Sequence, residues 1–165
     1  MTLLKQEPID QLKKDFSNSF KFRLALMGML PMGFLSGMKI VTLTEERCVV
    51  SVPYKRLNKN PFKSTFWAVL GMAAEMASGA LLVMFTRKQK PSVAMLVVKC
   101  EGQFHKKATS LTYFTCEDGL KIRKSIEETM QTKEPVLIET KIEGKDAAGE
   151  LIATFTFVWS VKGRA

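Results

Sequence analysis

Histidine and cysteine are scarce in this chain of 165 residues, which has one histidine and three cysteines. A Ser-His-Asp triad would need the single imidazole of His105, which lies beside two lysines in a strand-like stretch. We expect His105 to be a surface or partly exposed residue. The cysteines are widely spaced and form no CxxC pair, so the sequence predicts neither a disulfide framework nor a zinc site.

Several motifs are also missing. No GxGxxG or GxxxxGK[ST] pattern occurs, and no cluster of metal-ligating residues is visible, so we expect no nucleotide bound by such loops, no metal and no separate cofactor. The N-terminal stretch "MTLLKQEPIDQLKKDF" lacks the continuous apolar core of a secretory signal. Together with thiols expected to be reduced, this favours a cytoplasmic location.

Positively charged residues outnumber negatively charged ones in this chain. Lys and Arg number 25 and Asp and Glu 16, which gives a formal net charge of +9 and favours anionic partners such as nucleic acid, anionic lipid or a phosphorylated cofactor. The basic residues are scattered, with no run longer than two, and the phenylalanines mostly follow apolar patterns. These features argue against a nucleic-acid partner.

The length and the hydrophobic content of 46% fit one globular domain over residues 1–165. Apolar residues spaced three to four apart predict a helix over 8–23, opened by Pro8. The Met-rich stretch that follows is broken by glycines and a proline, so we expect residues 1–35 to form a helical cap.

Residues 36–162 are expected to form a sheet and a central helix. Residues 38–52 predict a hairpin with "TEER" as its turn, and further strands are predicted at 93–104, 108–116, 135–144 and 150–162, with a short helix at 120–131. The order indicates an α+β fold in which a mostly antiparallel sheet wraps around one long helix.

That helix contains residues 66–85, "FWAVLGMAAEMASGALLVMF", in which Glu75 alone can ionise. A membrane span, a buried structural carboxylate and a functional carboxylate are the three interpretations, and we favour the third. A single span without a second, amid many strand-like residues that need a core, argues against the membrane. Ser64 or Thr65 is the expected N-cap.

One face of this helix carries small or polar residues. At 100° per residue, Gly71 and Gly79 flank Glu75 on the same side, together with Ser64, Ala68 and Ser78. Glycine in a helix costs about 1 kcal/mol relative to alanine. We therefore expect a backbone, a partner helix or a ligand to approach this face closely.

The hairpin, an Asn-containing loop, the long helix with "AAExASGA" and the strands after it resemble the hotdog-fold acyl-CoA thioesterases, over about residues 33–162. The resemblance is closest to an uncharacterised branch of thioesterase-like members. In the better-understood members, the loop before the central helix resembles the pattern "Nxx(G)xxxHGG", and an acidic residue follows on the helix. Aligning that residue with Glu75 places Phe66, Trp67 and Ala68 on the His-Gly-Gly step, and Asn58 or Asn60 on the loop asparagine.

The resemblance implies hydrolysis of an acyl thioester, with coenzyme A as part of the substrate. Glu75 would be the base or nucleophile, Ser78 would orient it or the water, and Asn60 would complete the catalytic group. N–H groups from Thr65 to Ala68 would stabilise the oxyanion. Phosphates would dock on basic residues of the preceding loop: Lys55, Arg56, Lys59 and Lys63.

Two further expectations follow from the resemblance. Hotdog domains pair through their sheet edges and helices, so we expect a homodimer, or a dimer of such dimers, with the site at the interface. A non-catalytic acyl-CoA or fatty-acyl binding protein is the alternative function, favoured by the replaced glycines. The ten methionines suit an adaptable apolar pocket or ordinary core filling.

Overall fold

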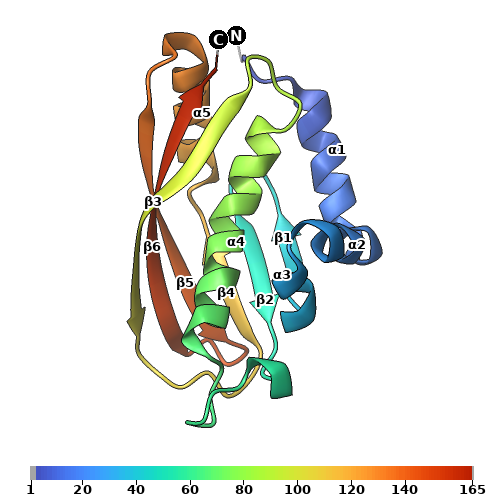
Figure 1. The fold of residues 1–165 in the computed structure, drawn as a ribbon, viewed down its shortest axis with the longest axis vertical. Coiled ribbons are helices and arrows are strands. Elements are labelled where there is room, and N and C mark those ends of the chain that lie inside the picture. The colour runs from blue at the N-terminus through green and yellow to red at the C-terminus, as the bar shows by residue number, and fades with distance from the viewer. Residues whose placement is uncertain (1–2, 165) are drawn as a thin grey trace.

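The computed structural model describes residues 3–164, and its centre is one six-stranded antiparallel sheet (Figure 1). The strand order is β1-β2-β4-β5-β6-β3. The strands are β1 (Lys39–Leu43), β2 (Cys48–Val52), β3 (Val93–Phe104), β4 (Thr112–Cys116), β5 (Val136–Asp146) and β6 (Leu151–Gly163). This curved sheet with one long helix against it is the hotdog fold, so the predicted fold is confirmed.

The strand predictions are mostly confirmed. Residues 93–104 form β3 as predicted, and β5 and β6 lie within two residues of their predicted limits. In the first hairpin the "TEER" turn is closed by the Thr44 N–H, which donates to the Arg47 carbonyl at 2.9 Å. The strand predicted at 108–116 begins only at Thr112. Ala108, at the start of the predicted strand, instead contacts the loop before the central helix, where its carbonyl accepts from the Thr65 N–H at 2.8 Å.

The central helix α4 (Trp67–Thr86) lies along the concave side of the sheet (Figure 1). It packs on β2, β4 and β5, and its buried residues include Leu81, Leu82, Met84 and Phe85, each 0% exposed. Length and composition alone would allow α4 to cross a membrane. Its apolar surface is instead accounted for by the sheet on one side and helices on others, which is the setting of an all-round apolar helix.

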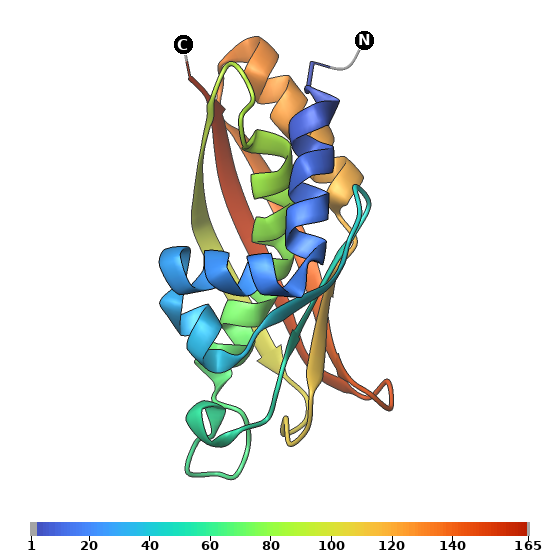
Figure 2. The same ribbon diagram turned by 90° about the vertical axis from the view of Figure 1, so that its right-hand side faces the viewer.

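Three helices precede the sheet and pack over β1 and α4 (Figure 2). They are α1 (Gln6–Ser17), α2 (Ser19–Met29) and α3 (Pro31–Ser36), and α2 crosses α4 at a steep angle. The prediction of one helix over 8–23 is wrong in two respects: α1 begins before Pro8, and the chain turns at Asn18. The Asn18 Oδ1 accepts from the N–H groups of Phe20 and Lys21, both at 3.1 Å, and so starts a second helix.

The last helix, α5 (Gly119–Thr132), connects β4 to β5 and covers the ends of β5 and β6. It matches the helix predicted at 120–131 to within one residue at each end. Gly163 passes so close to this helix that a Cβ there would lie 2.4 Å from the Thr129 carbonyl oxygen. The Thr129 hydroxyl accepts from the Gly163 N–H at 2.9 Å, which fixes the end of β6 against α5.

Candidate functional site

Glu75 lies in the middle of α4 and is half-buried. Burial in apolar surroundings raises the pKa of its carboxyl group. Within residues 3–164 no group donates a hydrogen bond to this carboxylate. Partial burial raises the pKa of the Cys100 thiol on β3, and the negative charge of Glu75 raises this pKa further. A half-buried carboxylate without a partner is a candidate acid or base.

The small residues beside Glu75 face the aromatic side chains of β6. A Cβ on Gly71 would lie 3.4 Å from the Phe155 ring, and one on Gly79 would lie 3.8 Å from the Trp159 ring. The close approach expected on this face is therefore made, within the chain, by aromatic side chains of the sheet. No backbone of another element and no second helix of residues 3–164 takes that place.

Ser78 is fully buried in this contact between α4 and β6. Its hydroxyl donates to the Glu75 backbone carbonyl at 3.1 Å and accepts from the Trp159 indole N–H at 3.1 Å. Both bonds are made to groups other than the Glu75 carboxylate. The hydroxyl thus fixes the indole of Trp159 against the helix, one turn beyond Glu75.

An apolar cavity of about 340 Å³ opens beside Glu75, between α4 and the N-terminal helices. Its walls come from α1, α2, β1, α4, β3 and β6, and Glu75 is the one ionisable residue among them. Gly79 and Trp159 also line it. A cavity of this size, mostly apolar with one ionisable group, is typical of a small-molecule site.

The N-terminus of α4 forms a second group of candidate residues. The predicted cap by Ser64 or Thr65 is wrong: Phe66 is the N-cap, and no side chain caps the helix. Thr65 is buried, whereas Phe66 and Trp67 are 43% and 58% exposed and pack edge to face at 5.7 Å. In the described chain the N–H groups of Trp67 and the half-buried Ala68 have no acceptor. They lie at the positive end of the helix dipole.

The two loop asparagines hold the loop together. The Asn58 side-chain amide donates to the backbone carbonyls of Ser36 and Pro53 at 2.9 and 2.7 Å. The backbone carbonyl of Asn58 accepts from the Phe66 N–H at 2.7 Å. The Asn60 carbonyl accepts from the Phe62 and Ser64 N–H groups, and its amide donates to the Ser64 hydroxyl at 3.0 Å. These bonds shape the entry to α4 and turn the Asn60 side chain toward its own loop.

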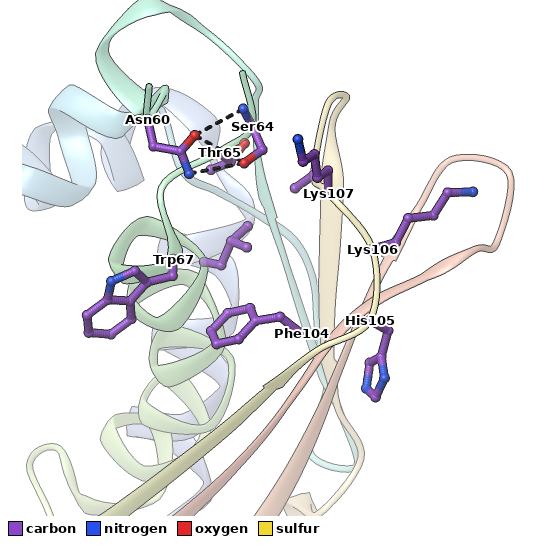
Figure 3. A pocket seen from close by; sticks show the side chains of 10 residues that line it. Asn60, Ser64, Thr65, Trp67, Phe104, His105, Lys106 and Lys107 are labelled. Atoms are coloured by element: carbon purple, nitrogen blue, oxygen red, sulfur yellow. Dashed lines mark hydrogen bonds between the residues drawn. The ribbon is translucent and has the colours of Figure 1, made fainter. Parts of the chain in front are cut away.

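A cavity of about 320 Å³ lies between this loop and the end of β3 (Figure 3). Asn60, Ser64, Thr65 and Trp67 line one side, and Phe104 to Ala108 line the other. Lys107 extends toward the loop, where its ammonium donates to the Phe62 carbonyl at 3.2 Å, whereas Lys106 pairs with Glu150. His105 is exposed as predicted, and its ring lies 3.1 Å from the Thr154 hydroxyl.

The predicted phosphate-binding lysines do not line this cavity. The ammonium of Lys59 lies over the Tyr54 ring at 4.5 Å, and Lys63 occupies a left-handed turn with φ 60°. The Tyr54 hydroxyl donates to the Lys63 carbonyl at 3.1 Å. Both lysines remain on the same loop as Asn60, at the helix end where the free N–H groups lie.

The structure thus separates the predicted site into two groups. Eight residues of helix separate Trp67 from Glu75, which corresponds to about 12 Å along the axis. Trp159, Cys100 and Lys107 were missed by the sequence analysis. Trp159 and Lys107 lie 84 and 32 residues from Glu75 in the chain, and only the sheet register brings β6 and β3 beside α4. The alternation of aromatic residues in "FTFVW" signals a buried face but not what that face meets.

A family model matches residues 21–161, and the chain belongs to that family, described as a domain of unknown function (DUF4442). No curated protein sequence matches the chain.

Solved structures show the same fold at low sequence identity. PA5026 from Pseudomonas aeruginosa, described as a probable thioesterase, has a TM-score of 0.74 at 17% identity, over 88% of this chain and 96% of that one. PaaI from E. coli, from the phenylacetic acid degradation operon, has a TM-score of 0.63 at 14% identity, over 93% and 96%. The thioesterase HI1161 from Haemophilus influenzae has 0.62 at 14%, over 99% and 96%.

Proposed function

We propose that the protein hydrolyses an acyl thioester, with Glu75 as the general base or nucleophile. The observation that carries this proposal is the half-buried, unpartnered carboxylate of Glu75 in the wall of an apolar cavity, with its pKa raised by burial. A raised pKa brings a carboxylate closer to the working range of a base. The thioesterases among the solved structures of this fold support the same reaction class.

As a base, Glu75 accepts a proton from water while the water oxygen attacks the thioester carbonyl. The resulting oxyanion is stabilised by the N–H groups of Trp67 and Ala68, which have no other acceptor. When the C–S bond breaks, the proton on Glu75 passes to the departing thiolate. The products are a carboxylic acid and a free thiol.

This mechanism requires two copies of the chain. The base and the oxyanion donors must both lie about 3 Å from the reacting group, yet within one chain they are about 12 Å apart along α4. Antiparallel pairing of two α4 helices about a twofold axis near Gly71, midway between Trp67 and Glu75, would bring the N-terminus of one helix beside Glu75 of the other. We therefore propose a homodimer, and leave a dimer of dimers open.

Coenzyme A is the proposed thiol carrier, and its phosphates are the anions that the charge of +9 favours. The lysines Lys59 and Lys63 belong to the loop that leads into the N-terminus of α4, and Lys107 extends toward this loop from the facing strand end. The proposal includes a cytoplasmic location, which the three free cysteines support. The proposal includes neither nucleic acid nor a membrane span.

Substitution of Glu75 by glutamine tests the chemistry, because Gln keeps the shape and hydrogen-bonding capacity but cannot accept the proton. We expect thiol release from a panel of acyl-CoAs to fall by about two orders of magnitude or more, with the fold retained. Undiminished turnover in Glu75→Gln would show that the chemistry lies elsewhere.

A complementation experiment tests the shared site. Trp67→Pro removes one free N–H at the first position of the helix, where proline is tolerated, and Phe66 already has the extended backbone that precedes proline (ψ 133°). Trp67→Pro and Glu75→Gln should each be inactive alone. An equal mixture of the two kinds of chain should recover about a quarter of wild-type activity, because half of the dimers are mixed and each mixed dimer has one intact site of its two. No recovery in demonstrably mixed dimers would place both groups in one chain.

The alternative is a non-catalytic acyl-CoA or fatty-acyl binding protein of the same fold. The exposed aromatic pair Phe66–Trp67 at the helix start and the internal hydrogen bonds of Asn60 favour it. Under this alternative acyl-CoAs bind with measurable heat and no thiol is released from any of them.

A further inference from the structure

We propose that the cavity between α2 and α4 holds the aliphatic acyl chain of the substrate, under a roof formed by the N-terminal helices. The inference rests on the proposed function, because it treats Glu75 as the group at the reacting end. It adds the substrate class: straight acyl chains of medium length.

The roof is built by the break between α1 and α2. At Asn18 the chain turns, and Phe16 of α1 meets Phe22 of α2 edge to face at 5.3 Å. Phe22 and Leu26 are both 5% exposed and point to the core side of α2, and Met29 lies at its far end. Phe16, Phe22 and Leu26 line the side of the cavity that faces away from the sheet, and the cavity opens to solvent beside Met29, which is 80% exposed.

The floor is a strip of α4 that runs away from Glu75. Met76, Gly79, Ala80 and Val83 follow one another along the helix and all line the cavity. Eight residues separate Glu75 from Val83, a length of about 12 Å. The floor is therefore an apolar track with a carboxylate at one end.

Gly79 keeps this track open at its middle. The Trp159 ring lies opposite, and its indole N–H is bonded to Ser78, so the ring presents an apolar surface to the cavity. A Cβ at Gly79 would be in ordinary contact with that ring, at 3.8 Å. Any longer side chain at this position must extend into the cavity.

The volume sets the length of the occupant. An apolar cavity of about 150 Å³ accommodates benzene, so by proportion the 340 Å³ here corresponds to about a dozen carbon atoms. The 12 Å track allows about ten carbons of an extended chain.

The chemistry of the wall selects an aliphatic chain. Apart from Glu75 and the indole of Trp159, the lining consists of alanine, glycine, phenylalanine, methionine and branched aliphatic side chains. Methionine adapts its shape to flexible ligands. The wall offers no second charged group to receive a polar substituent on the far end of the acyl group.

Contact between a bound chain and Trp159 provides a test that needs no turnover. In a Trp67→Phe background Trp159 is the one remaining tryptophan. We expect dodecanoic acid with bromine on its terminal carbon to quench the fluorescence of Trp159 in a saturable manner. Unbrominated dodecanoic acid should displace the brominated acid and restore the fluorescence. An exposed site elsewhere, or a cavity filled by the partner copy, would leave Trp159 unquenched and overturn the inference.

Substitution of Gly79 by leucine tests the chain-length limit. We expect wild-type kcat/KM to rise with chain length to about ten or twelve carbons. In Gly79→Leu it should fall about tenfold or more for dodecanoyl-CoA and by less than about twofold for butanoyl-CoA. Gly28→Leu is the control: Gly28 lies in α2 with nothing within 4 Å of its Cβ position and outside the cavity. It should leave both substrates unchanged.

The two experiments separate the two proposals. Quenching without hydrolysis of any acyl-CoA would retain the acyl site and reject the thioesterase function. Hydrolysis that Gly79→Leu reduces equally for short and long chains would retain the function and reject the cavity as the site of the acyl chain.

Discussion

The two edges of the sheet differ in length and in what covers them. β1 is five residues long and lies under α1 and α2. Both edge strands have one irregularity of register, between Ile40 and Thr42 in β1 and between Val97 and Lys99 in β3. β3 is twelve residues long, and Leu96 and Val98 on it are 65% and 50% exposed. Short or covered edges resist pairing, whereas a long edge with exposed apolar residues invites it. The comparison indicates that β1 is closed within the chain and that β3 is available to a second copy.

The side of β3 that faces the helix is also open. Cys100 and Gly102 lie opposite Phe157 and Phe155 of β6, so the Cys100 side chain and the open position at Gly102 are on the inner face of the sheet. Both β6 residues are buried beneath α4, but Cys100 is exposed. Glu75 is half-buried because it lies on the side of α4 toward this uncovered strand.

The largest effect is expected from weakening the cover of β1. Leu12 of α1 is 1% exposed and belongs to the continuous core. Leu12→Ala should lower the free energy of unfolding by about 2–5 kcal/mol, because it leaves a cavity between the cap and the sheet. Urea unfolding measures this. Leu24→Ala in the same cap, at a position 48% exposed, is the control and should change stability by less than about 0.5 kcal/mol. Equal effects would mean that α1 does not close this edge.

A charge on the open edge should separate the dimer. Leu96→Lys places an ammonium group where a second β3 would pair, and lysine on an edge strand opposes such pairing. Light scattering should then give 18.6 kDa, the mass of one chain, at micromolar concentration. Ser160→Lys is the matched control, since Ser160 lies directly opposite Leu96 on the interior strand β6. If both variants stay dimeric, the copies associate through another surface.

The smallest effect concerns the pH dependence of stability. Because burial raises the pKa of Glu75, its ionised form is disfavoured in the fold. The contribution of Glu75 to the free energy of unfolding is fully present below the unfolded pKa of about 4.3. It is lost as the pH rises toward and through the raised pKa of the folded state. Glu75→Gln should abolish that loss in unfolding curves recorded across this window. If the partner chain buries Glu75 further, the loss of stability with rising pH should be smaller in the monomeric variant Leu96→Lys. A wild type whose stability rises through the same window would contradict the direction of the shift.

Secondary structure was predictable where one local pattern was sufficient. The strands that became β3, β5 and β6 and the helix that became α5 follow from alternation and helical spacing in their own residues. The break at Asn18 was missed because the apolar spacing continues across it, while one side-chain amide ends one helix and starts the next. The cap of α4 was misplaced because the loop hydrogen bonds of Asn58 and Asn60 hold Ser64 and Thr65 outside the helix.

The sequence by itself determined that Glu75 would lie alone among apolar residues on a central helix with small neighbours. A helix periodicity and one ionisable side chain are enough for that statement, because both are local properties of about twenty residues. The tertiary structure alone decided what meets Glu75. Sheet register brings Trp159 against Gly79 and Ser78, and the turn at Asn18 carries Phe16 and Phe22 over the helix. These are contacts between distant segments, and no local pattern specifies the angle at which α2 crosses α4 or the cavity that this crossing leaves.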